Sequence, residues 1–137
     1  VNKNKLIILL YRYFFLKLST KLGFSIPINT FGPGLSIAHR GTICVNGGAK
    51  IGKNCRLHVC VNIGTAAGKD SDAPTIGDNC YIAPGVKMYG LIELGDNMVI
   101  GANSVVNKSF VEGECTIAGA PARVISKKSS FGLFQER

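Results

Sequence analysis

The chain has 137 residues, enough for one domain with a continuous apolar core but too few for two independent catalytic domains. It contains 17 glycines, no tryptophan and many valines and isoleucines, a composition that favours short strands joined by tight turns. The net charge of +8 suits anionic partners, but the basic residues are scattered and are not interleaved with aromatics, so we expect no nucleic acid partner.

The first predicted element is a helix within residues 1–23. Residues 6–18 are strongly apolar, but they carry Arg12 and Lys17 and are fewer than the ~20 residues that a membrane span requires. We therefore expect this helix to pack on the body of the protein or on a neighbouring subunit. Peripheral membrane contact through residues 6–18 is the alternative.

Beyond the helix, the sequence has a six-residue period. An aliphatic residue or methionine recurs at nine positions, each usually followed by a small residue. The nine are Ile51, Leu57, Ile63, Ile76, Ile82, Met88, Leu94, Ile100 and Val106. Neither a helix nor a simple alternating strand produces apolar positions at intervals of six. A three-sided coil does, because each hexapeptide forms one side with one inward residue and successive turns are joined by backbone hydrogen bonds.

We therefore predict an all-β protein. A parallel β-helix of hexapeptide repeats occupies residues 24–126, after the short N-terminal helix and before a C-terminal tail over residues 127–137. The period is broken at residues 47–50, because Ile43 and Ile51 are eight residues apart. A second break, small, polar and bounded by proline, predicts a loop that leaves the coil over residues 65–75.

The five cysteines form no CxxC pair and are odd in number, which argues against a disulfide framework and against a zinc ribbon. They are predicted to be reduced, buried small residues, and they indicate a cytoplasmic protein. These residues are Cys44, Cys55, Cys60, Cys80 and Cys115.

The repeat resembles that of the hexapeptide-repeat transferases, whose members form left-handed parallel β-helices, an exception to the usual right-handed crossover. Within this family the sequence is most similar to the serine acetyltransferase branch. The similar segments are GLSIAHRGTI at 34–43, VNIG at 61–64 and AGAPARV at 118–124, in the family's order. Few residues precede the coil, as in the short O-acetyltransferases of sugars and surface polysaccharides.

The resemblance places the family's catalytic base at His39. Acetyl transfer from a thioester to a hydroxyl needs a base because an alcohol becomes a good nucleophile only as its proton leaves, and imidazole titrates near neutral pH. Such a base contributes about 10²- to 10⁴-fold in rate. Backbone N–H groups of Gly64 and Thr65 are predicted to stabilise the negative charge that develops during transfer.

Departures from the serine-specific pattern concern the acceptor. The aspartate before the family's catalytic histidine is Ala38 here, and its downstream Arg-His pair aligns with Asp72 and Ala73. We therefore expect an O-acetyltransferase of a sugar or polysaccharide precursor, with a serine O-acetyltransferase or a non-catalytic scaffold as alternatives. The carboxylate that orients the base in the family has no clear counterpart, and Ser25 or Asn29 is the candidate replacement.

The resemblance also implies acetyl-CoA as acetyl donor, with its extended arm lying between coils where small residues allow close approach. The predicted cofactor-binding residues are Gly64, Thr65, Ala83, Pro84, Ala102, Gly119, Pro121, Arg123, Lys127 and Lys128. The cations among them are expected to face the CoA phosphates. For the lysines, a solvated tail is the alternative.

In similar enzymes each active site lies between two subunits of a homotrimer, and we expect the same here, with the loop at 65–75 bordering the neighbour's site. His58 is predicted to be exposed and to take no part in catalysis. No metal is expected, because the zinc enzymes built on this coil need three histidine ligands and this sequence has two histidines.

Overall fold

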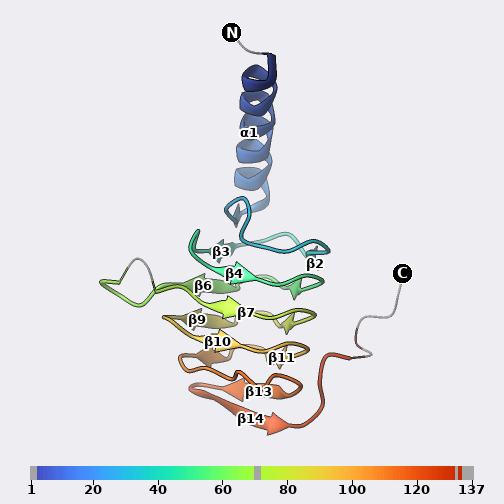
Figure 1. Ribbon diagram of the computed structural model, residues 1–137, viewed down its shortest axis with the longest axis vertical. Coiled ribbons are helices and arrows are strands. Elements are labelled where there is room, and N and C mark those ends of the chain that lie inside the picture. The colour runs from blue at the N-terminus through green and yellow to red at the C-terminus, as the bar shows by residue number, and fades with distance from the viewer. Residues whose placement is uncertain (1–2, 70–71, 132, 134–137) are drawn as a thin grey trace.

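The computed structural model describes residues 3–69, 72–131 and 133, and its body is a three-sided coil of short strands below one helix (Figure 1). The helix is α1 (Lys3–Leu22). Sheet A consists of β1 (Phe24–Ser25), β3 (Ile43–Val45), β6 (Asn62–Gly64), β9 (Lys87–Tyr89) and β12 (Val105–Val106). Sheet B consists of β4 (Lys50–Ile51), β7 (Thr75–Ile76) and β10 (Glu93–Leu94). Sheet C consists of β2 (Ser36–Ile37), β5 (Arg56–Leu57), β8 (Tyr81–Ile82), β11 (Val99–Ile100), β13 (Thr116–Gly119) and β14 (Ala122–Ser126).

Neighbouring strands within each sheet come from successive turns of the coil and are parallel, except that β14 folds back antiparallel on β13. This arrangement confirms the predicted all-β coil. Between β6 and β7 the chain leaves the coil as a loop, as predicted, although Thr75 already belongs to β7. Residues 70 and 71 of that predicted loop lie outside the described residues.

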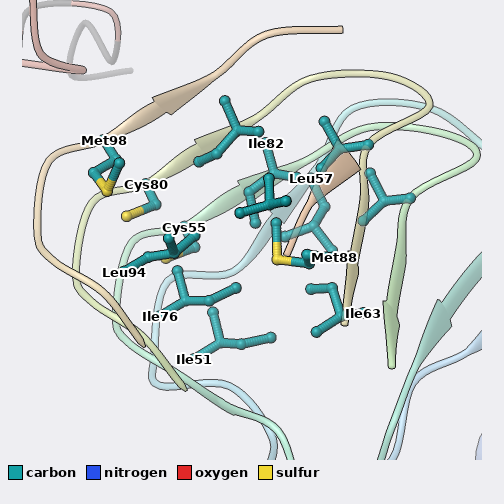
Figure 2. Close-up of a cluster of buried hydrophobic side chains, with 14 of the residues drawn as sticks. Ile51, Cys55, Leu57, Ile63, Ile76, Cys80, Ile82, Met88, Leu94 and Met98 are labelled. Atoms are coloured by element: carbon teal, nitrogen blue, oxygen red, sulfur yellow. The ribbon is translucent and has the colours of Figure 1, made fainter. Parts of the chain in front are cut away.

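The core is a stack of similar residues along the coil axis. All nine positions of the six-residue period are inward and no more than 5% exposed. Leu57 pairs in register with Ile82, which pairs with Ile100, and a second column contains Cys55 and Cys80 (Figure 2). Burial of each large aliphatic side chain contributes roughly 1.5–3 kcal/mol relative to exposure, so the repeat itself stabilises the coil.

Packing at the corner between sheets B and C explains why a small residue often follows the inward aliphatic residue of a repeat. Asn54, Asn79 and Asn97 adopt positive φ there, and the side-chain amide of each of the first two donates to the next, at 3.2 and 2.9 Å. At Gly77, two residues before Asn79, an added Cβ would lie 2.3 Å from Oδ1 of Asp96. Glycine is therefore required at this corner by the contact between turns.

The predicted position of the first break in the period is wrong. Val45, not Ile43, is in register with Ile63, so Val45 and Ile51 are the regular pair, six residues apart. Both Ile43 and Val45 are buried, which is why the sequence pattern did not distinguish them. The coil is regular through residues 47–50.

The extra residues lie instead in the segment 38–42. Eight residues separate Ile37 from Val45, whereas six separate the residues in register with them on the next turn, Leu57 and Ile63. The difference is an insertion of two residues where the chain passes from sheet C to sheet A. This corner of the first turn is therefore wider than the corners that follow it.

Helix α1 extends away from the coil and contacts it at β1 (Figure 1). Eleven apolar side chains between Leu6 and Leu18 are 41% to 73% exposed. The expectation that this helix packs on the body of the same chain is therefore wrong, while packing on a neighbouring subunit stays a prediction. Among the described residues, no helix combines the length and the hydropathy needed to cross a membrane.

The cysteines are all unpaired, but they are not all buried as predicted. Cys55 and Cys80 are buried inside the coil, Cys44 and Cys115 are half-buried, and Cys60 is exposed. Cys60 occupies a corner, where its φ of 60° directs the chain from one side of the coil to the next.

Candidate active site

The corner between sheets C and A carries His39 and runs along the coil. It contains residues 38–42 of the first turn, 58–60 of the second, 83–85 of the third and 101–103 of the fourth, and we call it the His39 corner. His39 lies within the two-residue insertion and its side chain is exposed. The base predicted from the sequence therefore stands outside the regular surface of the coil.

Backbone contacts hold this insertion at its far end. The N–H of Gly41, whose φ is 141°, donates to the carbonyl of Leu22 at 3.2 Å. The carbonyl of Thr42 accepts from the N–H of Cys60 at 2.7 Å. His39 is thus mounted on a segment that is fixed both to the end of α1 and to the following turn.

Several predicted cofactor residues lie on the same corner. Two residues beyond the in-register Ile37, Leu57, Ile82 and Ile100, a line of residues runs from His39 through Val59 to Pro84 and Ala102. Gly119 lies two residues after Ile117, which pairs with Ile100, so it ends the same line. Pro84, Ala102 and Gly119 are exposed, whereas Ala83 is buried beneath them. The structure therefore brings these small residues into one row below His39.

Gly64 and Thr65 lie at the C-terminal end of β6, whereas the His39 corner lies at the N-terminal ends of the strands of sheet A. They line a pocket of about 360 Å³, together with Asn62, Lys87 and Tyr89 among others. A Cβ added at Gly64 would meet only Oδ1 of Asn62 at 3.5 Å, an ordinary contact. The packing of the coil therefore gives no reason for glycine at this position, unlike at the corner between sheets B and C.

The predicted cations divide between two corners. Arg123 pairs with Ala118 close to the His39 corner. By contrast, the carbonyl of Lys128 accepts from Oγ1 of Thr116 at 2.6 Å, and the N–H of Ser130 donates to Asn97 at 2.9 Å. The antiparallel return of β14 thus carries Lys127 and Lys128 toward the corner between sheets B and C, and the structure does not bring them to the row of small residues.

The two residues considered for orienting the base do not contact it. Ser25 is exposed in β1, and Asn29 is exposed at the corner between sheets A and B, with a φ of 66°. Within the part of the chain that the structure describes, neither forms a hydrogen bond with His39.

His58 is the residue that the sequence analysis missed. It was expected to be exposed, but it is only 8% exposed, because Tyr81 and His39 lie on either side of it. Burial lowers the pKa of His58, and the positive charge of Arg56 and the neighbouring His39 lower it further. Its position in the repeat normally holds a small residue, as at Ala83. A large polar residue at such a position is the sequence signal that could have singled out His58.

Comparison with known proteins places the coil in a family. Residues 73–108 match the family model described as bacterial transferase hexapeptide (six repeats). The serine acetyltransferase of Synechococcus elongatus is 36% identical over 101 residues, which cover 72% of this chain and 41% of that protein. The serine acetyltransferase of Staphylococcus xylosus is 37% identical over 102 residues, which cover 69% of this chain and 47% of that protein.

Solved structures show the same likeness. The serine acetyltransferase of Brucella abortus in complex with coenzyme A has a TM-score of 0.65 and 31% identity, over 73% of this chain and 41% of that one. Soybean serine acetyltransferase complexed with serine has a TM-score of 0.63 and 30% identity, over 70% of this chain and 40% of that one. This chain thus spans less than half the length of these relatives. Its coil belongs to the hexapeptide-repeat transferases, in their serine acetyltransferase-like branch, and is a left-handed parallel β-helix.

Proposed function

We propose that this chain is an acetyl-CoA-dependent O-acetyltransferase in which His39 is the general base. The observation that carries the proposal is the position of His39, exposed on an insertion at the head of a row of small residues. Its coil is similar to proteins named serine acetyltransferases, one of them solved with coenzyme A.

The His39 corner suits an extended thioester such as acetyl-CoA. Pro84, Ala102 and Gly119 are exposed and small, so a chain-like ligand can approach the backbone along this row. Arg123 near the end of the row is a cation that can face a phosphate group. When bound there, acetyl-CoA would supply the acetyl group as a thioester.

His39 would act on the acceptor and not on the donor. A neutral ring nitrogen takes the proton of the acceptor hydroxyl as that oxygen attacks, and the exposed ring leaves this nitrogen accessible. The imidazolium later returns the proton to the leaving thiolate. Its location on a fixed insertion limits the reorientation that each cycle requires.

The Gly64–Thr65 segment is proposed to complete the site from a second copy of the chain. In one chain this segment lies at the far end of sheet A from His39, beside its own pocket. A homotrimer would bring the pocket of one copy to the His39 corner of the next. The unexplained glycine at position 64 supports a close approach by a ligand or a neighbouring chain.

Serine is the acceptor that the comparisons favour. The relatives described above are named serine acetyltransferases, and the soybean neighbour was solved with serine. This supports the serine alternative raised from the sequence better than the sugar or polysaccharide interpretation.

A sugar hydroxyl is the second candidate, because the side chains that distinguish the serine branch are missing. Ala38 carries no charge, and Ala73 is only 5% exposed, so neither can hold an amino-acid carboxylate. Asp72 has the wrong sign of charge for that role, and it forms an ion pair with Lys69 at 3.7 Å.

The test is thiol release from acetyl-CoA with serine, free sugars, nucleotide sugars and oligosaccharides as acceptors. We expect acceptor-dependent release that falls at least about 100-fold in His39→Ala. Arg40→Ala, on the same insertion, is the matched control and should stay within a few-fold of the native rate. Release that is unchanged in His39→Ala would refute the base, and no release together with no CoA binding would favour the scaffold alternative.

A further inference from the structure

His58 occupies a place where the coil otherwise has only small residues. The register of sheet C aligns it with Ala38 on the turn before and with Ala83 and Gly101 on the turns after. A large polar side chain therefore occupies a row in which the other turns have alanine or glycine. It is only 8% exposed, and its Nε2 has no hydrogen-bond partner among the described residues.

A buried nitrogen without a partner costs stability, so a polar group has to satisfy it in the working state. The nearest imidazole is that of His39, whose ring centroid lies 6.0 Å from that of His58 at an interplanar angle of 56°. Two imidazoles joined by one N–H···N bond have centroids about 5 Å apart, given ordinary hydrogen-bond lengths. The exposed ring of His39 can close the remaining gap by rotating about its own side-chain bonds.

The surroundings of His58 favour its neutral form. Arg56, in β5, precedes it by two residues, and the rings of Tyr81 and His39 lie 5.0 and 6.0 Å from its ring between centroids. Burial, Arg56 and His39 all lower the pKa of His58. A neutral imidazole offers one lone pair, which can accept a proton shared by a neighbouring ring.

We propose that His58 positions His39, by accepting at Nε2 a hydrogen bond from the ring N–H of His39 that faces away from the acceptor. This bond selects one tautomer of His39 and leaves the opposite ring nitrogen free to take the acceptor's proton. His58 thereby supplies the orienting contact that neither Ser25 nor Asn29 makes. The inference rests on the proposed function, in which His39 is the base.

The test is an NMR titration of the untagged full chain labelled with ¹⁵N-histidine, without acetyl-CoA or acceptor. The sequence has two histidines, so His58→Leu leaves a single imidazole to follow. A hydrogen bond accepted at Nε2 of His58 fixes which ring nitrogen of His39 carries the proton. In His58→Leu the ¹⁵N shifts of neutral His39 should therefore change from those of one tautomer to those of a mixture.

Two further variants separate the hydrogen bond from packing. His58→Gln places an amide oxygen where Nε2 lies and should restore the single tautomer of His39, whereas the shorter His58→Asn should not. This pair decides the matter even where His58→Leu fails to fold. The same tautomer of His39 in the native chain, His58→Gln and His58→Asn would overturn the proposal.

The titration also stands apart from the proposed function. If acetyl transfer is found but His39 has the same tautomer in all variants, His58 has no positioning role and the transferase proposal stands. If the tautomer changes as expected but no acceptor supports transfer, the contact between the two rings is supported and the proposed function fails.

Discussion

Two corners of the same coil differ in how regularly their residues pack from turn to turn. The corner between sheets B and C is regular: asparagines at positive φ join turn to turn, and glycines avoid contacts as short as 2.3 Å. The His39 corner has a two-residue insertion and a buried histidine nitrogen without a partner among the described residues. The first corner satisfies itself within one chain. At the second, an exposed histidine and a buried one lie 6.0 Å apart between ring centroids, and the regular repeat requires neither.

The comparison separates residues that the coil needs from residues that a ligand or a second copy needs. Gly77 and Gly64 are both glycines that follow an inward aliphatic residue, and the sequence pattern treats them alike. The structure distinguishes them, because an added Cβ at Gly77 meets Asp96 and backbone atoms, whereas at Gly64 it meets only Asn62 at 3.5 Å. A small residue in this repeat is therefore evidence for a ligand only where the packing does not explain it.

The largest expected effect is on the rate of acetyl transfer, at the His39 corner. His39→Ala should lower the rate of acetyl transfer by about 10²- to 10⁴-fold, because a positioned base contributes that much. Its free energy of unfolding should change by less than about 0.5 kcal/mol, because the side chain is exposed. Steady-state kinetics and urea unfolding of one preparation check both statements. A large loss of stability with a small loss of rate would show that His39 has a structural role and is not the base.

The next effect concerns the corner between sheets B and C. Gly77→Ala should lower the free energy of unfolding by roughly 2–4 kcal/mol, because the new Cβ would stand 2.7 Å from the backbone carbon of Gly95 and neither side can move easily. Chemical denaturation followed by circular dichroism measures this. An unfolding midpoint equal to that of the native chain would show that the turns are not held as closely as described.

Gly64→Ala is the matched variant at the open position. We expect a change in unfolding free energy below about 0.5 kcal/mol, since the added methyl group makes only an ordinary contact. Transfer should nevertheless slow by roughly 10-fold or more if a ligand or a second copy approaches the backbone there. Full activity in Gly64→Ala would remove the Gly64–Thr65 segment from the site.

The smallest expected effect is the pH dependence of stability at His58. Its pKa is lowered in the folded chain, so the unfolded chain binds the proton first as the pH falls. The native chain should lose stability as the pH drops through about 6.5, the unfolded value for histidine, and level off below the folded pKa. His58→Gln should show a shallower decline over this range in denaturation at several pH values. Identical curves would mean that His58 is not buried as described.

The sequence predicted most of the coil because one physical rule generates it. An inward aliphatic residue every six positions identified all nine buried positions, and a run of small and polar residues identified the loop after β6. The insertion was misplaced because two aliphatic residues, Ile43 and Val45, are both buried, and only pairing with the next turn shows which one keeps the period.

Less of the candidate site could be predicted from the sequence, because the surroundings of its residues depend on contacts between turns. The position of His39 followed from the resemblance, but the burial of His58 depends on Tyr81 one turn later and on the insertion before it. The antiparallel return of β14, which directs Lys127 and Lys128 away from the His39 corner, has no counterpart in the six-residue period.

The central claim is that His39 and the Gly64–Thr65 segment, which one chain keeps apart, act in one site formed by two copies. The most direct test mixes His39→Ala chains with Gly64→Val chains, each of which we expect to be inactive alone, under conditions that exchange subunits. The account predicts recovery of acetyl transfer in the mixture, because each mixed trimer contains one site with both native residues. A mixture that stays inactive, although sedimentation and labelled chains show mixed trimers, would contradict it.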